Sequence, residues 1–481
     1  MQPYRNFIAG KWVPPAAGGY YQTRNPARPE EPLGQFPCSL APDAEAGVAA
    51  ATAAQPAWRA TPGPQRGAIL YRFADLLDSH RQEIARVITL EQGKALGEAM
   101  GEVARAAVEA RYMAGEASRP LGQTFPSERA GFTCQTVREP IGVVAAISPW
   151  NFPVITPVRK IAPAIAFGNS VVFKPASLTP WSAIFVLEML EKAGLPGGVV
   201  NLVMGAGSSL GDAIVNHPGV AGISFTGSTA VGLGIAERAA RRNAAVQLEM
   251  GGKNPAIVFD YDDLDGAARE IVSAAFVCSG QRCTALSRVI VHEDQADGLV
   301  ARILDHAGRI RVGDGMAEGT TMGPLVSRAQ FDIVSDYVRR GREEGCLLLT
   351  GGVPLTDDPD RQGYYFAPTV FDGVRPESPL ATDEIFGPVL PVIRVPDAAT
   401  AIAVANATRY GLAASVFTTR MDLAHRLVDA LMTGMVHINH GTASQAHVPF
   451  GGRKESGQGA FSIGPTARDF FTSVKAVYAK W

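Results

Sequence analysis

Apolar residues recur at helical spacing early in the chain and predict a strong amphipathic helix. A second predicted helix covers about Gly97 to Ala117, with Glu98 and Glu102 near its start. Residues 1–60 are instead rich in Pro, Gly and Ala, so we expect them to wrap a surface. The apolar positions of the first helix are Ile69, Phe73, Leu76, Leu77, Ile84, Val87 and Ile88.

Short apolar runs alternate with amphipathic helices through the middle of the chain. This alternation is typical of a parallel, doubly wound sheet, in which ligands bind at the carboxyl ends of the strands. The predicted strands are Val143–Ile147, Ser170–Phe173, Val199–Val203 and Gly222–Phe225. The predicted helices are Pro180–Ala193, Leu210–Asn216 and Ala230–Arg241.

A second α/β pattern begins after Gly252 and predicts a separate domain that carries Cys283 near its start. Its strand candidates are Ile257–Phe259 and Arg288–His292, and its helices cover about 264–276, 296–307, 329–344, 398–407 and 423–431. Two more predicted strand segments, Arg119–Val137 and Phe470–Tyr478, belong to neither domain. Because unpaired strand edges invite pairing, we expect them to complete a sheet with another subunit.

Composition excludes several classes of protein. The chain has 481 residues, a net charge of −2 and 46% hydrophobic residues, which is ordinary for a multidomain globular protein and offers nothing to nucleic acid or a membrane surface. Its five cysteines form no metal or disulfide motif and its histidines lack zinc spacing, so no metal site is expected. No signal peptide or membrane span is apparent, and we expect a cytoplasmic enzyme.

The most informative residue is Cys283, which follows Gly280-Gln-Arg282. Nearby positive charge favours a thiolate, which is the nucleophilic form of cysteine. Upstream, Glu249 stands immediately before two glycines. A thiol and a carboxylate are the minimum equipment for acyl transfer through a thioester followed by hydrolysis.

Three other motifs follow predicted strands. Thr226–Gly232 could place helix amide groups against a phosphate, or could be an ordinary capped helix. Asn151 lies between aromatic residues and prolines. It could be a rigid donor to an oxyanion, or it could be an ordinary turn asparagine. Lys174 could reach a ribose or phosphate, or could be solvated.

Together these runs resemble the aldehyde dehydrogenase superfamily over essentially the whole chain, in the order and spacing of that family's motifs. The resemblance implies two Rossmann-like domains, a cofactor-binding and a catalytic one, plus a small β arm. The implied boundaries are 1–118 with 141–251, then 252–445, and 119–140 with 462–481 for oligomerisation. The matching runs are Pro149–Pro153, Lys174-Pro-Ala176, Phe225–Gly232, Leu248–Gly252, Gly280–Cys283, Glu384–Pro388 and Pro449–Gly457.

The resemblance also implies residue roles. Cys283 is the expected nucleophile, Glu249 the general base, and Asn151 with the Cys283 backbone N–H the oxyanion hole. NAD or NADP is the expected cofactor, an aldehyde the substrate, and a homodimer or homotetramer the assembly. The expected cofactor-binding residues are Ser148, Pro149, Trp150, Lys174, Ser177, Gly207, Gly227, Ser228, Gly232, Glu384 and Phe386.

Two features bear on specificity. Ser177 stands where NAD-specific members often carry a glutamate, and a serine does not repel a 2′-phosphate, so NADP use stays open. Arg282 and Arg159 favour an aldehyde with a distal carboxylate or phosphate, unless both make structural salt bridges. The alternatives to a dehydrogenase are a cysteine esterase or thioesterase and a non-catalytic structural protein on the same scaffold.

Overall fold

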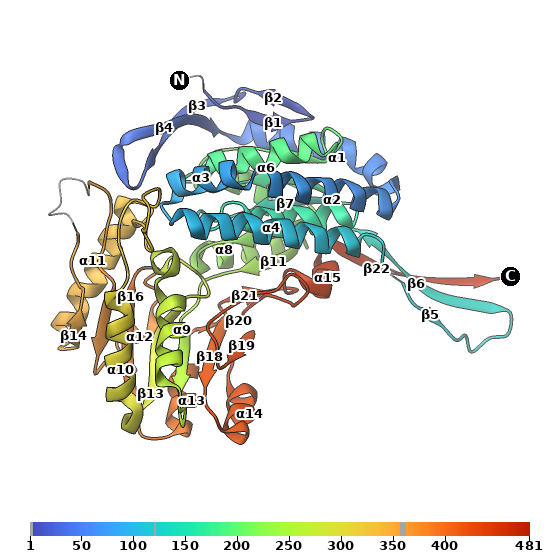
Figure 1. The fold of residues 1–481 in the computed structure, drawn as a ribbon. Helices are drawn as coiled ribbons and strands as arrows, with labels where there is room; N and C mark the ends of the chain where they lie inside the picture. The colour runs from blue at the N-terminus through green and yellow to red at the C-terminus, as the bar shows by residue number, and fades with distance from the viewer. Residues whose placement is uncertain (1–2, 120–121, 356–361) are drawn as a thin grey trace.

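The computed structural model describes residues 3–119, 122–355 and 362–481, which form two helix-covered sheets and a projecting arm of strands (Figure 1). The first sheet has eight strands in the order β2-β1-β9-β8-β7-β10-β11-β21. Its strands are β1 (Asn6–Ile8), β2 (Lys11–Val13), β7 (Val143–Ile147), β8 (Ser170–Lys174), β9 (Val200–Leu202), β10 (Gly222–Thr226), β11 (Ala245–Glu249) and β21 (Gly457–Gln458).

The five central strands of this sheet are parallel. β7 and β8 are buried along their whole length, which explains their largely apolar sequences. Along β7, Val143, Ala145 and Ile147 face one core while Val144 and Ala146 face the other. Helices α1 (Ala41–Ala60), α7 (Asp212–Asn216) and α8 (Thr229–Ala240) cover the first face. The other face carries α2 (Gly63–Ser79), α3 (Arg81–Gln92), α4 (Leu96–Glu116), α5 (Ile155–Ala166) and α6 (Pro180–Lys192).

Parallel pairing brings the strand ends that carry motifs to one edge of the sheet. Ile147 of β7 pairs with Lys174 of β8 and with Phe225 of β10, and Thr226 pairs with Glu249 of β11. The chain leaves β7 in one direction towards β8 and β9, and returns on the other side at β10. Such a reversal of strand order opens a crevice at the carboxyl ends, where α/β proteins bind ligands.

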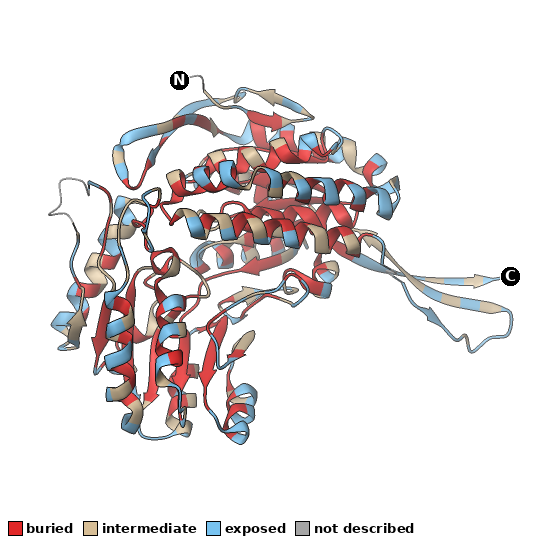
Figure 2. Ribbon diagram, in the orientation of Figure 1, coloured by how far each residue is buried: buried red, intermediate tan, exposed pale blue. Residues whose placement is uncertain are grey.

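The second sheet has the order β14-β15-β16-β13-β12-β18-β19 and is parallel except for β14. Its buried strands form the red interior of the lower lobe in Figure 2. Its strands are β12 (Asn254–Val258), β13 (Leu286–His292), β14 (Leu347–Thr350), β15 (Thr369–Asp372), β16 (Val389–Val395), β18 (Ala413–Phe417) and β19 (Met435–Ile438). Its helices are α9 (Leu264–Phe276), α10 (Glu293–Gly308), α11 (Arg328–Glu343), α12 (Pro379–Thr382), α13 (Ala398–Asn406) and α14 (Met421–Ala430).

The projecting arm is a sheet of β5 (Thr124–Phe125), β6 (Phe132–Pro140) and β22 (Thr472–Lys480). β22 pairs with β6 along its whole length, from Thr472 opposite Pro140 to Lys480 opposite Phe132. Large apolar side chains on this arm, among them Val474, Tyr478 and Trp481, are exposed. The remaining elements are β3 (Gly18–Asn25), β4 (Arg28–Ser39), η1 (Gly207–Gly211), η2 (Val277–Gly280), β17 (Tyr410–Gly411), β20 (Arg453–Lys454), η3 (Gly464–Thr466) and α15 (Ala467–Phe471).

Two expectations from the hydrophobic pattern are wrong. Residues 1–60 do not merely wrap a surface, because β1 and β2 extend the first sheet and the alanine-rich α1 buries Val48 and Trp58 against it. Alanine has the highest helix propensity, a signal that the prolines and glycines of this stretch obscured. The first amphipathic segment is also two helices, since the backbone turns at His80 between α2 and α3.

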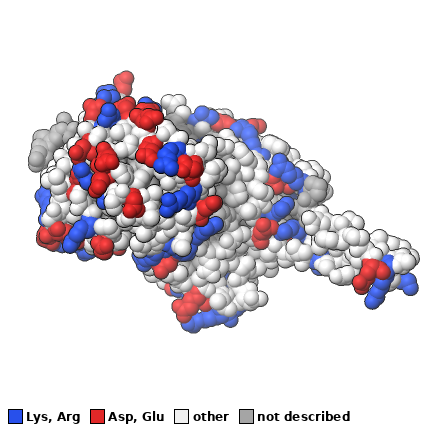
Figure 3. Space-filling model, turned by 90° about the horizontal axis from the view of Figure 1, so that it is seen from below, with Lys and Arg blue, Asp and Glu red and all other residues white. Residues whose placement is uncertain are grey.

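The surface agrees with the composition. On the face seen in Figure 3, acidic and basic side chains alternate without a large area of one sign. Within the described ranges, no helix is long and apolar enough to cross a bilayer.

Candidate active site

One cavity of about 640 Å³ brings together residues from both sheets and from α4. It contains the predicted nucleophile, base and oxyanion donor, together with part of the predicted cofactor set. The residues that line the cavity include Lys94, Glu98, Glu102, Arg105, Pro149, Trp150, Asn151, Phe152, Arg159, Gly227, Ser228, Glu249, Cys278, Arg282, Cys283, Ser444, Phe450, Glu384 and Phe386.

Cys283 lies in the loop between η2 and β13. Its backbone carbonyl accepts a hydrogen bond from Asn254 Nδ2 at 2.7 Å, which fixes the loop to the start of β12. The side chain packs against a small apolar cluster that includes Phe450. Burial raises the pKa of the Cys283 thiol to about 12, Glu249 and Glu384 add to this, and Arg159 and Arg282 act in the opposite direction. The neighbouring arginines favour the thiolate, as the sequence predicts, but desolvation outweighs them.

Asn151 stands in the turn between β7 and α5 and is 4% exposed. Its Nδ2 donates to the backbone carbonyl of Gln281 at 2.9 Å, so its amide is tied to the loop that carries Cys283. An amide nitrogen has two hydrogens, and this bond uses one of them. The second hydrogen is available to an oxygen in the cavity.

Glu249 ends β11 and is buried, which raises the pKa of its carboxyl group, although Arg159, Lys160 and Ser462 counteract this. Ser462 Oγ donates to Glu249 Oε1 at 2.8 Å. Burial lowers the pKa of Lys160 to about 7, while the charge of Glu249 acts to raise it. Sequence reasoning missed Lys160 and Ser462. Lys160 lies on the buried face of α5, and nothing in the sequence linked Ser462 to a residue so far upstream.

The residues expected to bind the cofactor lie along the carboxyl edge of the first sheet. Ser148 is the first residue after β7, and Pro149 lines the cavity behind it. Lys174 ends β8, and its Nζ donates to the carbonyl of Pro175 at 3.0 Å. Burial lowers the pKa of Lys174 to about 8. Ser177 lies in the turn that follows β8, half-buried.

The loop and helix after β10 have the form of an anion site. Ser228 is the N-cap of α8, and its side chain makes no capping bond to the first turn. A Cβ on Gly232 would lie 2.3 Å from the Met250 sulfur, and one on Gly227 would lie 2.5 Å from the Phe225 ring. These glycines therefore allow α8 to pack closely on the sheet, with its amide groups at the cavity.

Five of the predicted cofactor residues are not in the cavity wall, namely Ser148, Lys174, Ser177, Gly207 and Gly232. Gly207 is exposed in η1 after β9, and an added Cβ there would meet nothing within 4 Å. Lys174 lies next to the same turn, since a Cβ on Gly211 would be 3.7 Å from its Cδ and Cε. Together with Ser177, these residues extend the crevice along the sheet edge, away from Cys283.

At the other end of the crevice, Glu384 and two aromatic rings meet the first sheet. Glu384 Oε1 accepts from the backbone N–H of Gly252 at 2.9 Å, and burial raises the pKa of Glu384 to about 7. The rings of Trp150 and Phe386 pack edge to face with centroids 5.4 Å apart. The available ammonium, carboxylate, helix amides and aromatic wall suit a dinucleotide with two ribose groups and a pyrophosphate.

Arginines surround the part of the cavity beyond Asn151. Arg159 makes two hydrogen bonds to Glu109, at 3.1 and 2.6 Å, and its guanidinium lies 4.6 Å from the centre of the Phe450 ring. Of the two roles considered for Arg159, substrate binding or a structural salt bridge, the structure shows the salt bridge. Arg282 has no carboxylate partner within the described part of the chain, and its Nη2 donates to the Thr284 hydroxyl at 3.2 Å.

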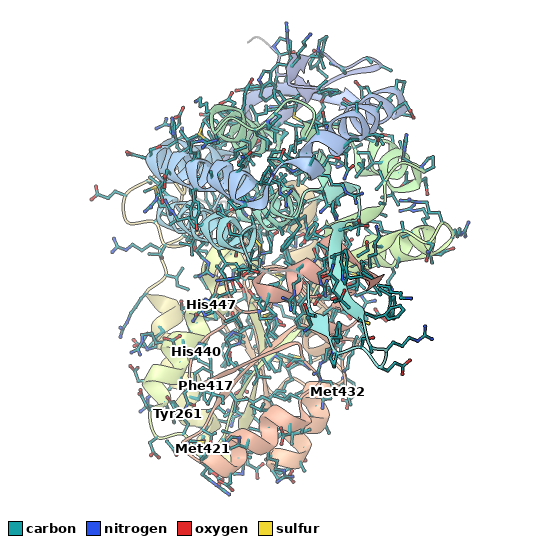
Figure 4. All side chains as sticks on the ribbon, turned by 90° about the vertical axis from the view of Figure 1, so that its right-hand side faces the viewer. Tyr261, Phe417, Met421, Met432, His440 and His447 are labelled. Carbon is teal, nitrogen blue, oxygen red and sulfur yellow. The ribbon has the colours of Figure 1, made fainter. Side chains whose placement is uncertain are left out.

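Arg105 is a cavity residue that sequence reasoning missed. It projects from α4, and its Nη2 donates to the hydroxyl of Ser444 at 2.9 Å and to the carbonyl of the same residue. Ser444 belongs to the loop 440–447, which follows β19. Figure 4 shows His440 and His447 of this loop above Phe417, towards the first sheet. Helical position alone could not show that Arg105 faces the cavity.

Comparisons with known proteins identify the family. Residues 12–477 match the model of the aldehyde dehydrogenase family. The chain belongs to this family. It is 42% identical over 478 residues to an α-ketoglutaric semialdehyde dehydrogenase of Bacillus subtilis (strain 168), covering 99% of this chain and 98% of that protein. It is 40% identical to an α-ketoglutarate semialdehyde dehydrogenase of Haloferax volcanii, covering 99% of each.

Solved structures of aldehyde dehydrogenases share the fold. The structure of an NADP-dependent enzyme from E. coli aligns with a TM-score of 0.96 at 35% identity, covering 100% of this chain and 98% of that one. An NAD-dependent aldehyde dehydrogenase from Sinorhizobium meliloti aligns with a TM-score of 0.96 at 36% identity, covering 100% and 95%.

These matches confirm the expected fold and activity. The chain has two Rossmann-like α/β units and is an NAD(P)-dependent oxidoreductase that oxidises an aldehyde. Within the described residues, no group of histidine, cysteine and carboxylate side chains could hold a metal ion.

The raised pKa of Cys283 predicts slow, pH-dependent alkylation of the enzyme without cofactor. Because the thiol is mostly protonated near neutrality, its reaction with iodoacetamide should accelerate about tenfold per pH unit between about pH 7 and 9. Peptide mass spectrometry would measure the Cys283 adduct, with Cys283→Ala as the blank. A rate that levels off below pH 8 would show that positive charge, rather than burial, controls the thiol.

Proposed function

We propose that this enzyme oxidises a semialdehyde with a distal carboxylate, using Cys283, Glu249 and Asn151. The observation that carries the proposal is the pair of arginines, Arg105 and Arg282, in the cavity that holds Cys283. Neither has a carboxylate partner in the described ranges of the chain. Arg105 is exposed and Arg282 is half-buried, and both line the cavity, so a substrate carboxylate there could form charge-assisted hydrogen bonds with them.

The names of two relatives support the same substrate class. The Bacillus subtilis and Haloferax volcanii proteins are named for α-ketoglutaric semialdehyde, which carries a carboxylate at the end remote from the aldehyde. Arg159 contributes less in this proposal, because Glu109 already neutralises it. We therefore assign the substrate carboxylate to Arg282 and Arg105.

In the proposed reaction, the Cys283 thiol gives its proton to solvent water, and the sulfur then attacks the aldehyde carbon. The carbonyl oxygen becomes an alkoxide, and Asn151 Nδ2 and the Cys283 backbone N–H donate to it. NAD or NADP, when bound, would supply the acceptor for the hydride, and loss of that hydride would leave a thioester on Cys283. Glu249 then takes a proton from water, the resulting hydroxide attacks the thioester carbon, and the carboxylic acid leaves as the Cys283 thiolate is restored.

The cofactor is proposed to lie along the crevice described above. Lys174 and Ser177 would bind the adenine-side ribose, and the start of α8 at Ser228 the pyrophosphate. Glu384 would bind the second ribose, beside the Trp150 and Phe386 rings. Lys174 suits this role because its ammonium has three donors and makes one hydrogen bond in the structure.

The arm and the compartment are further proposals. We assign residues 119–140 and 462–481 to a homodimer or homotetramer contact, because β22 is an edge strand with exposed Val474 and Tyr478. The division into a cofactor-binding unit (1–118 with 141–251) and a catalytic unit (252–445) is our interpretation of the two sheets. A cytoplasmic location is supported by five free cysteines.

Glu249→Gln tests the assignment of the base. Hydride transfer should still occur, but the thioester should persist because the amide cannot accept a proton from water. Rapid mixing should show a burst of about one reduced cofactor per active site at 340 nm, followed by turnover at least about a hundredfold slower than wild type. Cys283→Ala should give no burst. Steady turnover of Glu249→Gln at the wild-type rate would remove this residue from the mechanism.

Ser177→Glu tests the ribose site. A carboxylate beside Lys174 should repel a 2′-phosphate by about 1–4 kcal/mol in a partly screened site. The NADP-to-NAD ratio of kcat/KM should therefore fall at least about tenfold. Ser177→Gln has nearly the same shape without the charge and should leave the ratio within about threefold of wild type. If both variants shift the ratio equally, charge at this position does not select the cofactor.

Arg282→Met and Arg105→Met test the substrate class. A lost charge-assisted hydrogen bond of about 2–3 kcal/mol should lower kcat/KM for 2-oxoglutaric semialdehyde roughly thirty- to hundredfold. Propanal has no distal carboxylate and serves as the control, with an expected loss under about threefold. Equal losses for the two aldehydes would mean that the arginines activate the thiol or support the fold.

A further inference from the structure

The buried ion pair between Lys94 and Glu102 has no part in the reaction as proposed above. Lys94 Nζ lies 2.7 Å from Glu102 Oε2, and the two side chains are 1% and 0% exposed. Both residues nevertheless line the cavity that contains Cys283. Burying two charges is expensive and seldom improves stability over apolar residues, so such a pair calls for another explanation.

The contacts of the pair converge on the segment that carries Asn151. Lys94 Nζ also donates to the backbone carbonyl of Asn151 at 2.7 Å and lies 4.0 Å from the centre of the Phe152 ring. Glu102 Oε1 accepts from the backbone N–H groups of Val154 and Ile155 at 2.8 and 3.1 Å. One ion pair therefore binds the backbone on both sides of the turn between β7 and α5.

Glu98, one helical turn before Glu102 on α4, binds the loop that leads to Cys283. Glu98 Oε1 accepts from the backbone N–H of Cys278 at 2.9 Å. Cys278 and Ser279 both have a φ of 57°, a left-handed conformation that non-glycine residues adopt only where surrounding contacts impose it. Gln281 Nε2 donates to the Cys278 carbonyl at 3.1 Å, within the same loop.

The two branches meet at the hydrogen bond from Asn151 Nδ2 to the Gln281 carbonyl. Residues at and just before the start of α4 thus bind both the segment that carries the Asn151 amide and the loop that leads to the Cys283 thiol. Their relative position fixes the gap in which the substrate oxygen must lie. Oxyanion donors work only within a few tenths of an ångström of their best position, so this gap has to be rigid.

We propose that Lys94 and Glu102 are positioning residues, which set the oxyanion hole by holding the Asn151 backbone against the loop of Cys283. This inference rests on the proposed roles of Asn151 and Cys283. In this proposal Lys94 and Glu102 act through the backbone of Asn151, Val154 and Ile155.

Testing this role requires a variant that does not leave one charge buried alone. Lys94→Met with Glu102→Gln removes both charges, keeps both volumes, and leaves a glutamine oxygen to accept from Val154 and Ile155. Glu91→Gln is the matched control, because Glu91 is also a fully buried carboxylate that accepts backbone N–H groups, from Trp181 and Ser182 at the start of α6. It does not line the cavity.

The experiment is a double-mutant cycle on single-turnover hydride transfer, followed at 340 nm with saturating cofactor. Asn151→Ala alone should slow hydride transfer about a hundredfold. The paired variant Lys94→Met/Glu102→Gln should slow it at least about tenfold, with the Kd of the cofactor within about twofold of wild type. Adding the paired variant to Asn151→Ala should cost less than a further factor of about two, because the amide it positions is gone. Glu91→Gln should transfer hydride at the wild-type rate.

Each other result has a distinct meaning. A paired variant at wild-type speed, with Asn151→Ala slow, overturns the positioning role and leaves the proposed function intact. Losses that multiply in the combined variant also overturn it, since the pair would then act independently of Asn151. A normal rate in Asn151→Ala overturns the proposed role of Asn151, and this inference with it.

A second variant keeps the test decisive if the neutral pair does not fold. Lys94→Arg keeps the charge and the salt bridge but moves the donors away from the Asn151 carbonyl. In the same cycle it should slow hydride transfer at least about threefold, and that loss should disappear in the Asn151→Ala background. A wild-type rate in Lys94→Arg would contradict the proposal.

Discussion

The register of the parallel strands in the first sheet determines where everything else can act. Ile147, Lys174 and Thr226 lie at neighbouring strand ends because hydrogen-bonded ladders align them, and Glu249 pairs directly with Thr226. A slip of one residue would turn the side chains of a strand to the opposite face. The two cores that cover this sheet allow no such slip, since each receives alternate residues of the same strands. The crevice is therefore a product of core packing.

Cys283, the proposed nucleophile, lies in a loop that leads into the second sheet, so the proposed reacting groups meet only where the two units are joined. The backbone N–H of Met250 donates to the Ser456 carbonyl at 2.9 Å, directly after Glu249, the proposed base. Asn254 then binds the carbonyl groups of Cys283 and Ala285. A few hydrogen bonds within this short stretch, from Glu249 to Asn254, thus connect the carboxylate to the thiol loop.

The fold and the motifs could be predicted from local sequence, but the contacts that adjust the chemistry of the motif residues could not. Strand β7 and helix α9 were predicted with their observed bounds, because continuous apolar runs and amphipathic spacing are local signals. The motif residues Asn151, Glu249 and Cys283 were placed in one site by family resemblance. Arg105 and Ser462 escaped notice, because each meets its partner across hundreds of residues. The raised pKa of the Cys283 thiol could not be predicted from local sequence either, because burial depends on the assembled cavity.

The hydrogen bond between Ser462 and Glu249 joins the proposed base to a segment 213 residues further along the chain. That segment lies between β21 and η3 and belongs to neither sheet. A hydroxyl that donates to a buried carboxylate favours its ionised form. The loop that positions Ser462 therefore influences how readily Glu249 can take up a proton, although it contributes no atom to the proposed reaction.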